Sequence, residues 1–186
     1  MIPFQAPMFK SVVIRSLLLA CLGALIVATN AWSHGNHHGG SSTLDPAMKG
    51  SGPDVHLYRD ASCRCCTKWG NALATEGFNV IDHISNDLEA MKRDEGVPAD
   101  LASCHTAFVE GYVLEGHVPV PSIQRLLREM PEITGLAVPG MPIGSPGMEV
   151  AGRTGDRYQV IALQDQGRQT IYDSYQGPNL QKASAR

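Results

Sequence analysis

Three cysteines lie within four residues of this 186-residue chain, in the motif Cys63-Arg64-Cys65-Cys66. A thiolate is both a nucleophile and a soft metal ligand, and nearby positive charge favours it over the thiol. Arg64 supplies one such charge. A helix beginning at or just after Cys63 would add the partial positive charge of its amino end. We therefore expect these thiols to be unusually acidic.

A fourth cysteine, Cys104, comes much later in the chain and is followed by a histidine. Compact groups of thiolates select Cu(I), zinc or iron–sulfur clusters. Structural zinc sites usually use two separated pairs of ligands, which this spacing does not provide. Because Cu(I) shares thiolates readily, we favour copper, as more than one Cu(I) ion held by Cys63, Cys65, Cys66 and Cys104.

Four further residues carry ligand atoms that suit copper, namely His105, His117, Met141 and Met148. Imidazole nitrogen and thioether sulfur both bind this metal. Each residue also has a second interpretation. His105 could orient a cysteine through a hydrogen bond, His117 could be a structural cap, and the two methionines could fill gaps in a loop.

Two other uses of the cysteines remain open. Cys63 and Cys66 have the C-x-x-C spacing of a thiol–disulfide oxidoreductase, for which Cys65 between them is not needed. A small exported domain could instead hold two disulfides. Because Cys65 and Cys66 are adjacent and cannot easily bridge each other, Cys104 would then pair with one of the other three.

Strands and helices are expected to alternate around these residues. Hydrophobic periodicity and turn residues predict the following elements: strand 55–59, a helix from about 63 to 76, strand 78–84, a helix from 85 or 86, strands 106–109 and 111–114, and a helix capped by Ser122. The order β-α-β-α-β-β-α is that of a thioredoxin-like α/β domain. In such a domain Cys104 would face the amino end of the first helix.

The chain after the third helix changes character. Residues 135–150 contain three prolines and four glycines, which predicts a shaped Gly/Pro/Met loop. Residues 158–162 and 169–172 then predict a closing β-hairpin. We expect the domain to cover residues 53–175 and a flexible tail to cover 176–186.

Residues 1–33 have the pattern of an export signal. A basic start is followed by the apolar run 16–28, whose 13 residues are too few to span a bilayer, which takes about 20. We expect cleavage near Ser33, a periplasmic location and no stable membrane insertion afterwards. An uncleaved anchor and lipidation at Cys21 are the alternatives. Residues 34–52 form a His/Gly/Ser-rich linker, which could collect Cu(II) or Zn(II) loosely.

The charge balance excludes one class of partner. With 15 Lys+Arg against 18 Asp+Glu, the chain has a formal net charge of −3 and no basic stripe. Nucleic-acid binding needs such a stripe to neutralise phosphates, so we expect no nucleic-acid partner.

The sequence resembles the CopG-type family of exported copper-resistance proteins. The resemblance covers about Val55 to Tyr158 and rests on C-R-C-C-T-K-W, E-G-F-N-V, G-V-P-A-D-L-A-S-C-H-T-A, G-Y-V-L-E-G-H-V-P and G-L-A-V-P-G-M-P-I-G-S-P-G-M-E. It implies a thioredoxin-like domain whose cysteines Cys63, Cys65, Cys66 and Cys104 hold copper in the periplasm. Copper ions and other periplasmic copper-handling proteins would be its partners, and copper could change oxidation state on it.

Overall fold

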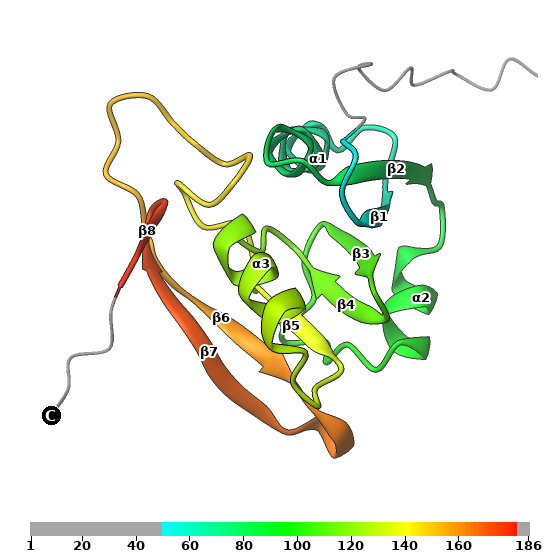
Figure 1. Cartoon of the computed structure of the whole chain (residues 1–186). Coiled ribbons are helices and arrows are strands. Elements are labelled where there is room, and N and C mark those ends of the chain that lie inside the picture. The colour runs from blue at the N-terminus through cyan, green and yellow to red at the C-terminus, as the bar shows by residue number, and fades with distance from the viewer. Residues whose placement is uncertain (1–49, 182–186) are drawn as a thin grey trace, which may run out of the picture. The chain divides into compact units, whose positions relative to one another are not determined.

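A computed structural model describes residues 50–181, which form a mixed α/β fold (Figure 1). The predicted export signal, most of the predicted linker and the last five residues lie outside the described residues. No helix within residues 50–181 is both long and apolar enough to cross a membrane. The elements are β1 (Asp54–Arg59), α1 (Arg64–Thr75), β2 (Asn79–Ile84), α2 (Leu88–Asp94), β3 (His105–Val109), β4 (Tyr112–Glu115), α3 (Val120–Glu129), β5 (Gly135–Ala137), β6 (Arg157–Leu163), a short 3₁₀ turn (Asp165–Gly167), β7 (Gln169–Gln176) and β8 (Asn179–Leu180).

The strands of the described part of the chain form one sheet in the order β2-β1-β3-β4-β5-β6-β7-β8. β1 runs parallel to β2 and β4 parallel to β5, whereas the other neighbouring pairs are antiparallel. From β1 to α3 the elements follow the predicted order β-α-β-α-β-β-α.

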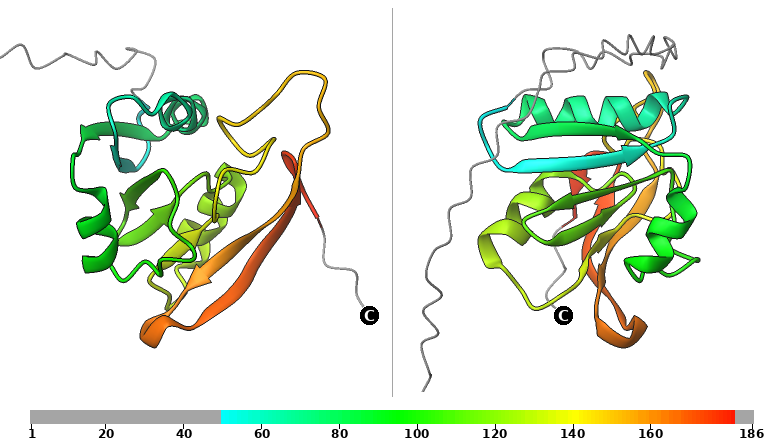
Figure 2. Two further views of the ribbon diagram at one scale, coloured as in Figure 1. Left: turned by 180° about the vertical axis from the view of Figure 1, so that it is seen from behind. Right: turned by 90° about the vertical axis from the view of Figure 1, so that its right-hand side faces the viewer.

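The two faces of the sheet build two hydrophobic cores, because successive strand residues point to opposite faces. On one face, Trp69 of α1 and Ile123 of α3 pack with strand residues such as Leu114. On the other face, Val97 in the turn after α2 packs near Val113. Figure 2 shows α3 and α2 on opposite sides of the strands.

Two strands lie where the sequence predicts a loop and a tail. Gly135–Ala137 form β5, which pairs with β4 on one side and with β6 on the other. A side chain at Gly135 would be 2.0 Å from the carbonyl oxygen of Val113, so only glycine allows the two strands to approach this closely. β8 pairs with β7 and carries the sheet past residue 175. The β5 pairing depends on strands distant in sequence, which local patterns do not report, whereas β8 follows β7 directly after a two-residue turn.

Ser122 has a different role from the predicted helix cap. Pro119 occupies the cap position of α3, and Ser122 lies inside the helix. The Ser122 hydroxyl donates to Oδ2 of Asp173 on β7 at 2.7 Å, and Nη1 of Arg125 donates to Oδ1 at 3.0 Å. The guanidinium of Arg125 also lies over the ring of Tyr172, 3.7 Å from its centre. These contacts attach the β6–β7 hairpin to α3.

We predict that Asp173→Ala lowers the free energy of unfolding by about 2 to 3 kcal/mol, because two hydrogen bonds to a nearly buried carboxylate are lost. Urea unfolding of the metal-free protein measures this. The matched control is Glu129→Gln, which removes only an exposed ion pair to Arg125 at 3.7 Å and should cost less than about 0.5 kcal/mol. Equal losses of unfolding free energy in the two variants would contradict the role given to Asp173.

Candidate metal centre

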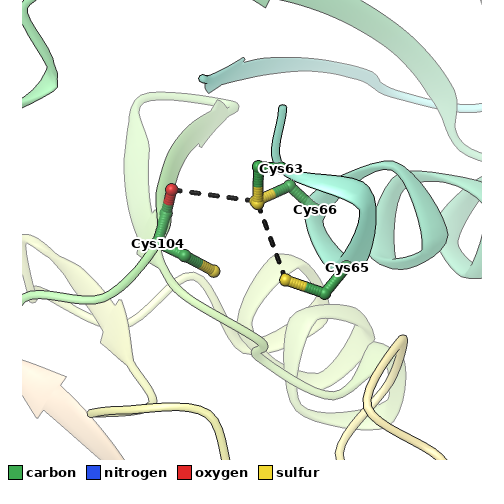
Figure 3. A group of neighbouring side chains, drawn as sticks. All are labelled: Cys63, Cys65, Cys66 and Cys104. Carbon is green, nitrogen blue, oxygen red and sulfur yellow. Dashed lines mark hydrogen bonds between the residues drawn. A yellow bond between two sulfur atoms is a disulfide. The ribbon is translucent and has the colours of Figure 1, made fainter. Parts of the chain in front are cut away.

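The Cys63–Cys66 motif lies at the amino end of α1. Cys63 is the N-cap residue of the helix, and Cys65 and Cys66 belong to its first turn. Cys66 is fully buried, whereas Cys63 and Cys65 are partly exposed, with their sulfur atoms 3.6 Å apart. The motif therefore has sulfur both in the interior and near the surface. Figure 3 shows its three cysteines at the start of α1, with Cys104 beside them.

Cys104 reaches the motif because β1 and β3 are antiparallel neighbours. Arg59, which ends β1, is paired with His105, which begins β3. The residues just after β1 therefore lie beside the residue just before β3. The sulfur atoms of Cys63, Cys65, Cys66 and Cys104 all lie within 4.8 Å of one another.

Cys63 and Cys66 are joined by a disulfide in this structure, and Cys65 and Cys104 are free thiols. Among the cysteines of residues 50–181 there is thus one disulfide, so the interpretation as two disulfides does not describe this state. Metals bind thiolates, so a site using all four sulfur atoms requires this disulfide to be reduced.

Cys104 also belongs to a second group of ligand atoms, with His105 and His117. Its sulfur lies 3.1 Å from Nε2 of His117 and 3.4 Å from Nδ1 of His105. Nδ1 of His117 is 2.8 Å from the carbonyl oxygen of Pro146 and must donate to it, which leaves Nε2 free to accept a proton or a metal. Nε2 of His105 is buried without a hydrogen-bond partner.

Burial sets the protonation of this second group. It lowers the pKa of His105 well below its usual value and also lowers the pKa of His117, so both imidazoles are neutral and able to bind a metal. Burial, followed by the charge of Cys65, raises the pKa of the Cys104 thiol to about 12. A metal binding at Cys104 must therefore displace its proton.

The Gly/Pro/Met loop packs against the cysteine motif. At Gly147, where φ is +83°, a side chain would come within 2.8 Å of the carbonyl oxygen of Cys65 and of the backbone nitrogen of Trp69. Glycine therefore allows the loop to contact α1 beside the thiols. Met148 is the next residue, and its backbone N–H donates to the carbonyl oxygen of Ser145 at 2.8 Å.

Met141 lies elsewhere, with 53% of its surface exposed at the edge of an open hollow that also borders Tyr158. The structure thus brings His105 and His117 to Cys104 but places the Met141 side chain at the surface. A ligand role for either Met141 or Met148 stays a prediction.

Sequence reasoning missed a buried ion pair beside Cys104. Oε1 of Glu115 accepts from Nζ of Lys92 at 2.7 Å and from the backbone N–H of Ser103 at 2.6 Å, and Oε2 accepts from the hydroxyl of Thr106 at 2.7 Å. Both charged side chains are almost completely buried. The pair therefore fixes the backbone on both sides of Cys104. The available sequence signal was a charged residue, Glu115, directly after the apolar run 112–114.

Comparisons with known proteins support the same segment. A family model described as a protein of unknown function, DUF411, matches residues 101–148, which include Cys104, His105 and His117. Two solved structures, both described as copper resistance protein CopG (forms 1 and 2), are each 44% identical to this chain with a TM-score of 0.63. Form 1 covers 68% of this chain and 100% of its own, and form 2 covers 66% and 98%. No curated protein matches.

We predict that Glu115→Gln lowers the free energy of unfolding by about 3 to 5 kcal/mol, because it leaves the buried ammonium of Lys92 without its countercharge. Lys92→Met should cost a similar amount for the converse reason. The double variant Lys92→Met, Glu115→Leu should cost less than the sum of the two. Urea unfolding measures all three, with the exposed Glu89→Gln as control. Strict additivity would show that the two groups do not interact.

A second prediction concerns the protonation of Cys104. In a Cys65→Ser variant whose Cys63–Cys66 disulfide is intact, Cys104 is the remaining free thiol of residues 50–181. Burial, the largest cause of its raised pKa, remains in this variant although the charge of Cys65 is gone, so Cys104 should stay a thiol at neutral pH. Its alkylation rate should then keep rising with pH above the pKa of an ordinary thiol. A rate that levels off near pH 8 to 9, as for an ordinary thiol, would contradict this.

Proposed function

Since this chain belongs to the family of the copper resistance protein CopG, we propose that it acts in copper resistance by holding Cu(I) in a thiolate cluster. The ligands would be Cys63, Cys65, Cys66 and Cys104. The observation that carries the proposal is the convergence of their four sulfur atoms within 4.8 Å. Thiolates in so compact a group are ligands for a soft metal ion.

More than one copper ion is favoured by the arrangement of the ligands. Cys104 is shared between the four-sulfur group and the group with His105 and His117. A thiolate has more than one lone pair and can bridge two ions, so the shared sulfur suits a cluster. The neutral imidazoles add ligands without adding negative charge.

The disulfide gives the centre a second state. Reduction of the Cys63–Cys66 disulfide yields two further thiols, so the number of sulfur ligands doubles from two to four. Copper affinity would therefore follow the redox state of this pair. Such coupling supports a role in which bound copper also changes oxidation state.

We also propose the thioredoxin-like assignment of the domain and its export to the periplasm. The strand order β2-β1-β3-β4, with α1 beginning at the C-x-x-C motif, supports the first. The basic and apolar pattern of residues 1–33 supports the second. Partners would be copper ions and other periplasmic copper-handling proteins.

A thiol–disulfide oxidoreductase using Cys63 and Cys66 is the second candidate. The disulfide between them in this structure favours it. Against it, the free thiols of Cys65 and Cys104 lie beside the pair and would compete as nucleophiles. A copper centre uses all four sulfur atoms, whereas this activity needs only two.

An anaerobic Cu(I) titration of the reduced protein, with a chromophoric chelator competing and free thiols counted in parallel, tests the proposed function. We expect several Cu(I) ions to bind as all four thiols become protected. Each single Cys→Ser variant should lose at least about tenfold in affinity, since one ligand is removed. Met130→Leu, on the exposed end of α3, is the matched control and should bind as the unmodified chain does.

Two results would decide against copper. A variant with Ser at all four cysteine positions that binds Cu(I) as tightly as the unmodified chain would remove the proposed ligands. Turnover of a disulfide substrate by the metal-free protein, faster than by free dithiol, would move the assignment to the oxidoreductase.

A further inference from the structure

Two histidines on neighbouring strands of the sheet lie outside the ligand groups that the cysteines form. His56 of β1 and His83 of β2 point to the face opposite α1, because the alternate β1 residues Val55 and Leu57 pack into the α1 core. His83 is paired with Tyr58, so His56 is its diagonal neighbour. Nδ1 of His56 and Nε2 of His83 are 3.0 Å apart.

The pair is not explained by the packing of the fold. Both rings are only partly buried, and within residues 50–181 their one hydrogen bond is to each other. In this contact one ring nitrogen donates its N–H and the other accepts it. Neither histidine belongs to the ligand groups around Cys104.

The nitrogen separation matches that of two neighbouring ligands on one metal ion. Nitrogen ligands lie about 2.0 to 2.1 Å from a first-row divalent ion. Two such ligands at a right angle are about 2.9 Å apart, and two at the tetrahedral angle are about 3.3 Å apart. The observed separation of 3.0 Å is nearer to the value for a right angle between the two ligands. Right angles between neighbouring ligands are the geometry of tetragonal Cu(II).

Neighbouring aromatic rings hold the pair in place. Tyr58 stacks on His83 with ring centres 4.5 Å apart, and the edge of Phe108 on β3 packs against Tyr58 at 5.6 Å. The rings of His56 and His83 are within 11° of parallel. To bind one ion, each ring would turn about its Cβ–Cγ bond until both lone pairs point to that ion. Because both rings are partly exposed, water can fill the other coordination positions.

We propose that His56 and His83 form a second metal site, which binds one divalent copper ion on the sheet face opposite α1. The ion takes the place of the hydrogen between the two rings, and the donor ring then carries its proton on its other nitrogen, as the alternative tautomer. This site is separate from the thiolate centre and does not depend on the function proposed for it. Its nitrogen ligands suit the harder Cu(II), whereas thiolates suit Cu(I).

The test uses a chain in which the other candidate ligands are removed or separated. Cys63, Cys65, Cys66 and Cys104 are changed to Ser, His34, His37 and His38 are changed to Ala, and His117 is changed to Gln so that His105 keeps no neighbouring ligand. Cu(II) is added and followed by calorimetry and electron paramagnetic resonance. We expect one Cu(II) ion whose spectrum shows hyperfine coupling to two nitrogen atoms.

Adding His56→Ala or His83→Ala to this chain should lower the Cu(II) affinity at least about tenfold and remove that coupling. Glu129→Gln, at an exposed position of α3 on the other face of the sheet, is the control and should bind as before. Unchanged affinity in both histidine variants overturns the proposal.

A second measurement covers the case in which the serine variant does not fold. Crystals of the unmodified chain are soaked in Cu(II), and anomalous diffraction is recorded at the copper edge. A peak between His56 and His83 supports the site. Copper peaks only beside the cysteines, with none at this pair, overturn it while leaving the proposed thiolate centre intact.

Discussion

The carboxylate of Glu115 joins the parts of the chain that carry the centre. It lies on β4 and binds Lys92 of α2, the backbone of Ser103 and the hydroxyl of Thr106. Because the group is fully buried, leaving any of its hydrogen bonds unmade is costly, and the segment around Cys104 is held in one conformation. A cluster of soft ligands needs such a support, since thiolates attract a metal but do not position themselves.

Burial has opposite effects on the two kinds of ligand in this segment. It keeps the imidazoles of His105 and His117 neutral, and that is the form that binds metal. It keeps Cys104 protonated, and that form does not bind. The charge of a bound cation reverses this penalty by compensating the thiolate. Metal binding and proton release at Cys104 are therefore one coupled event.

The sequence predicted what depends on local patterns. The periodicity of 55–59 and of the α1 segment gave their elements, and the sulfur spacing identified the residues that converge. What it missed depends on distant contacts. β5 requires the backbones of β4 and β6, the Ser122 hydroxyl requires Asp173, and Glu115 requires a lysine on another element. A residue's type shows what it can bind, but only the fold shows which partner is in reach.

The cysteine cluster and the His56–His83 pair arise in two different ways from the fold. Thiolates reach one another only where two element ends meet, which here is the junction of β1 with α1 beside the start of β3. A histidine side chain is longer than a cysteine side chain, so two histidines can meet from adjacent strands. The parallel pairing of β1 with β2 brings His56 and His83 together in this way. The first arrangement gathers soft ligands, which suits Cu(I). The second stays wet, and an ion that keeps water ligands there is better suited to the divalent state.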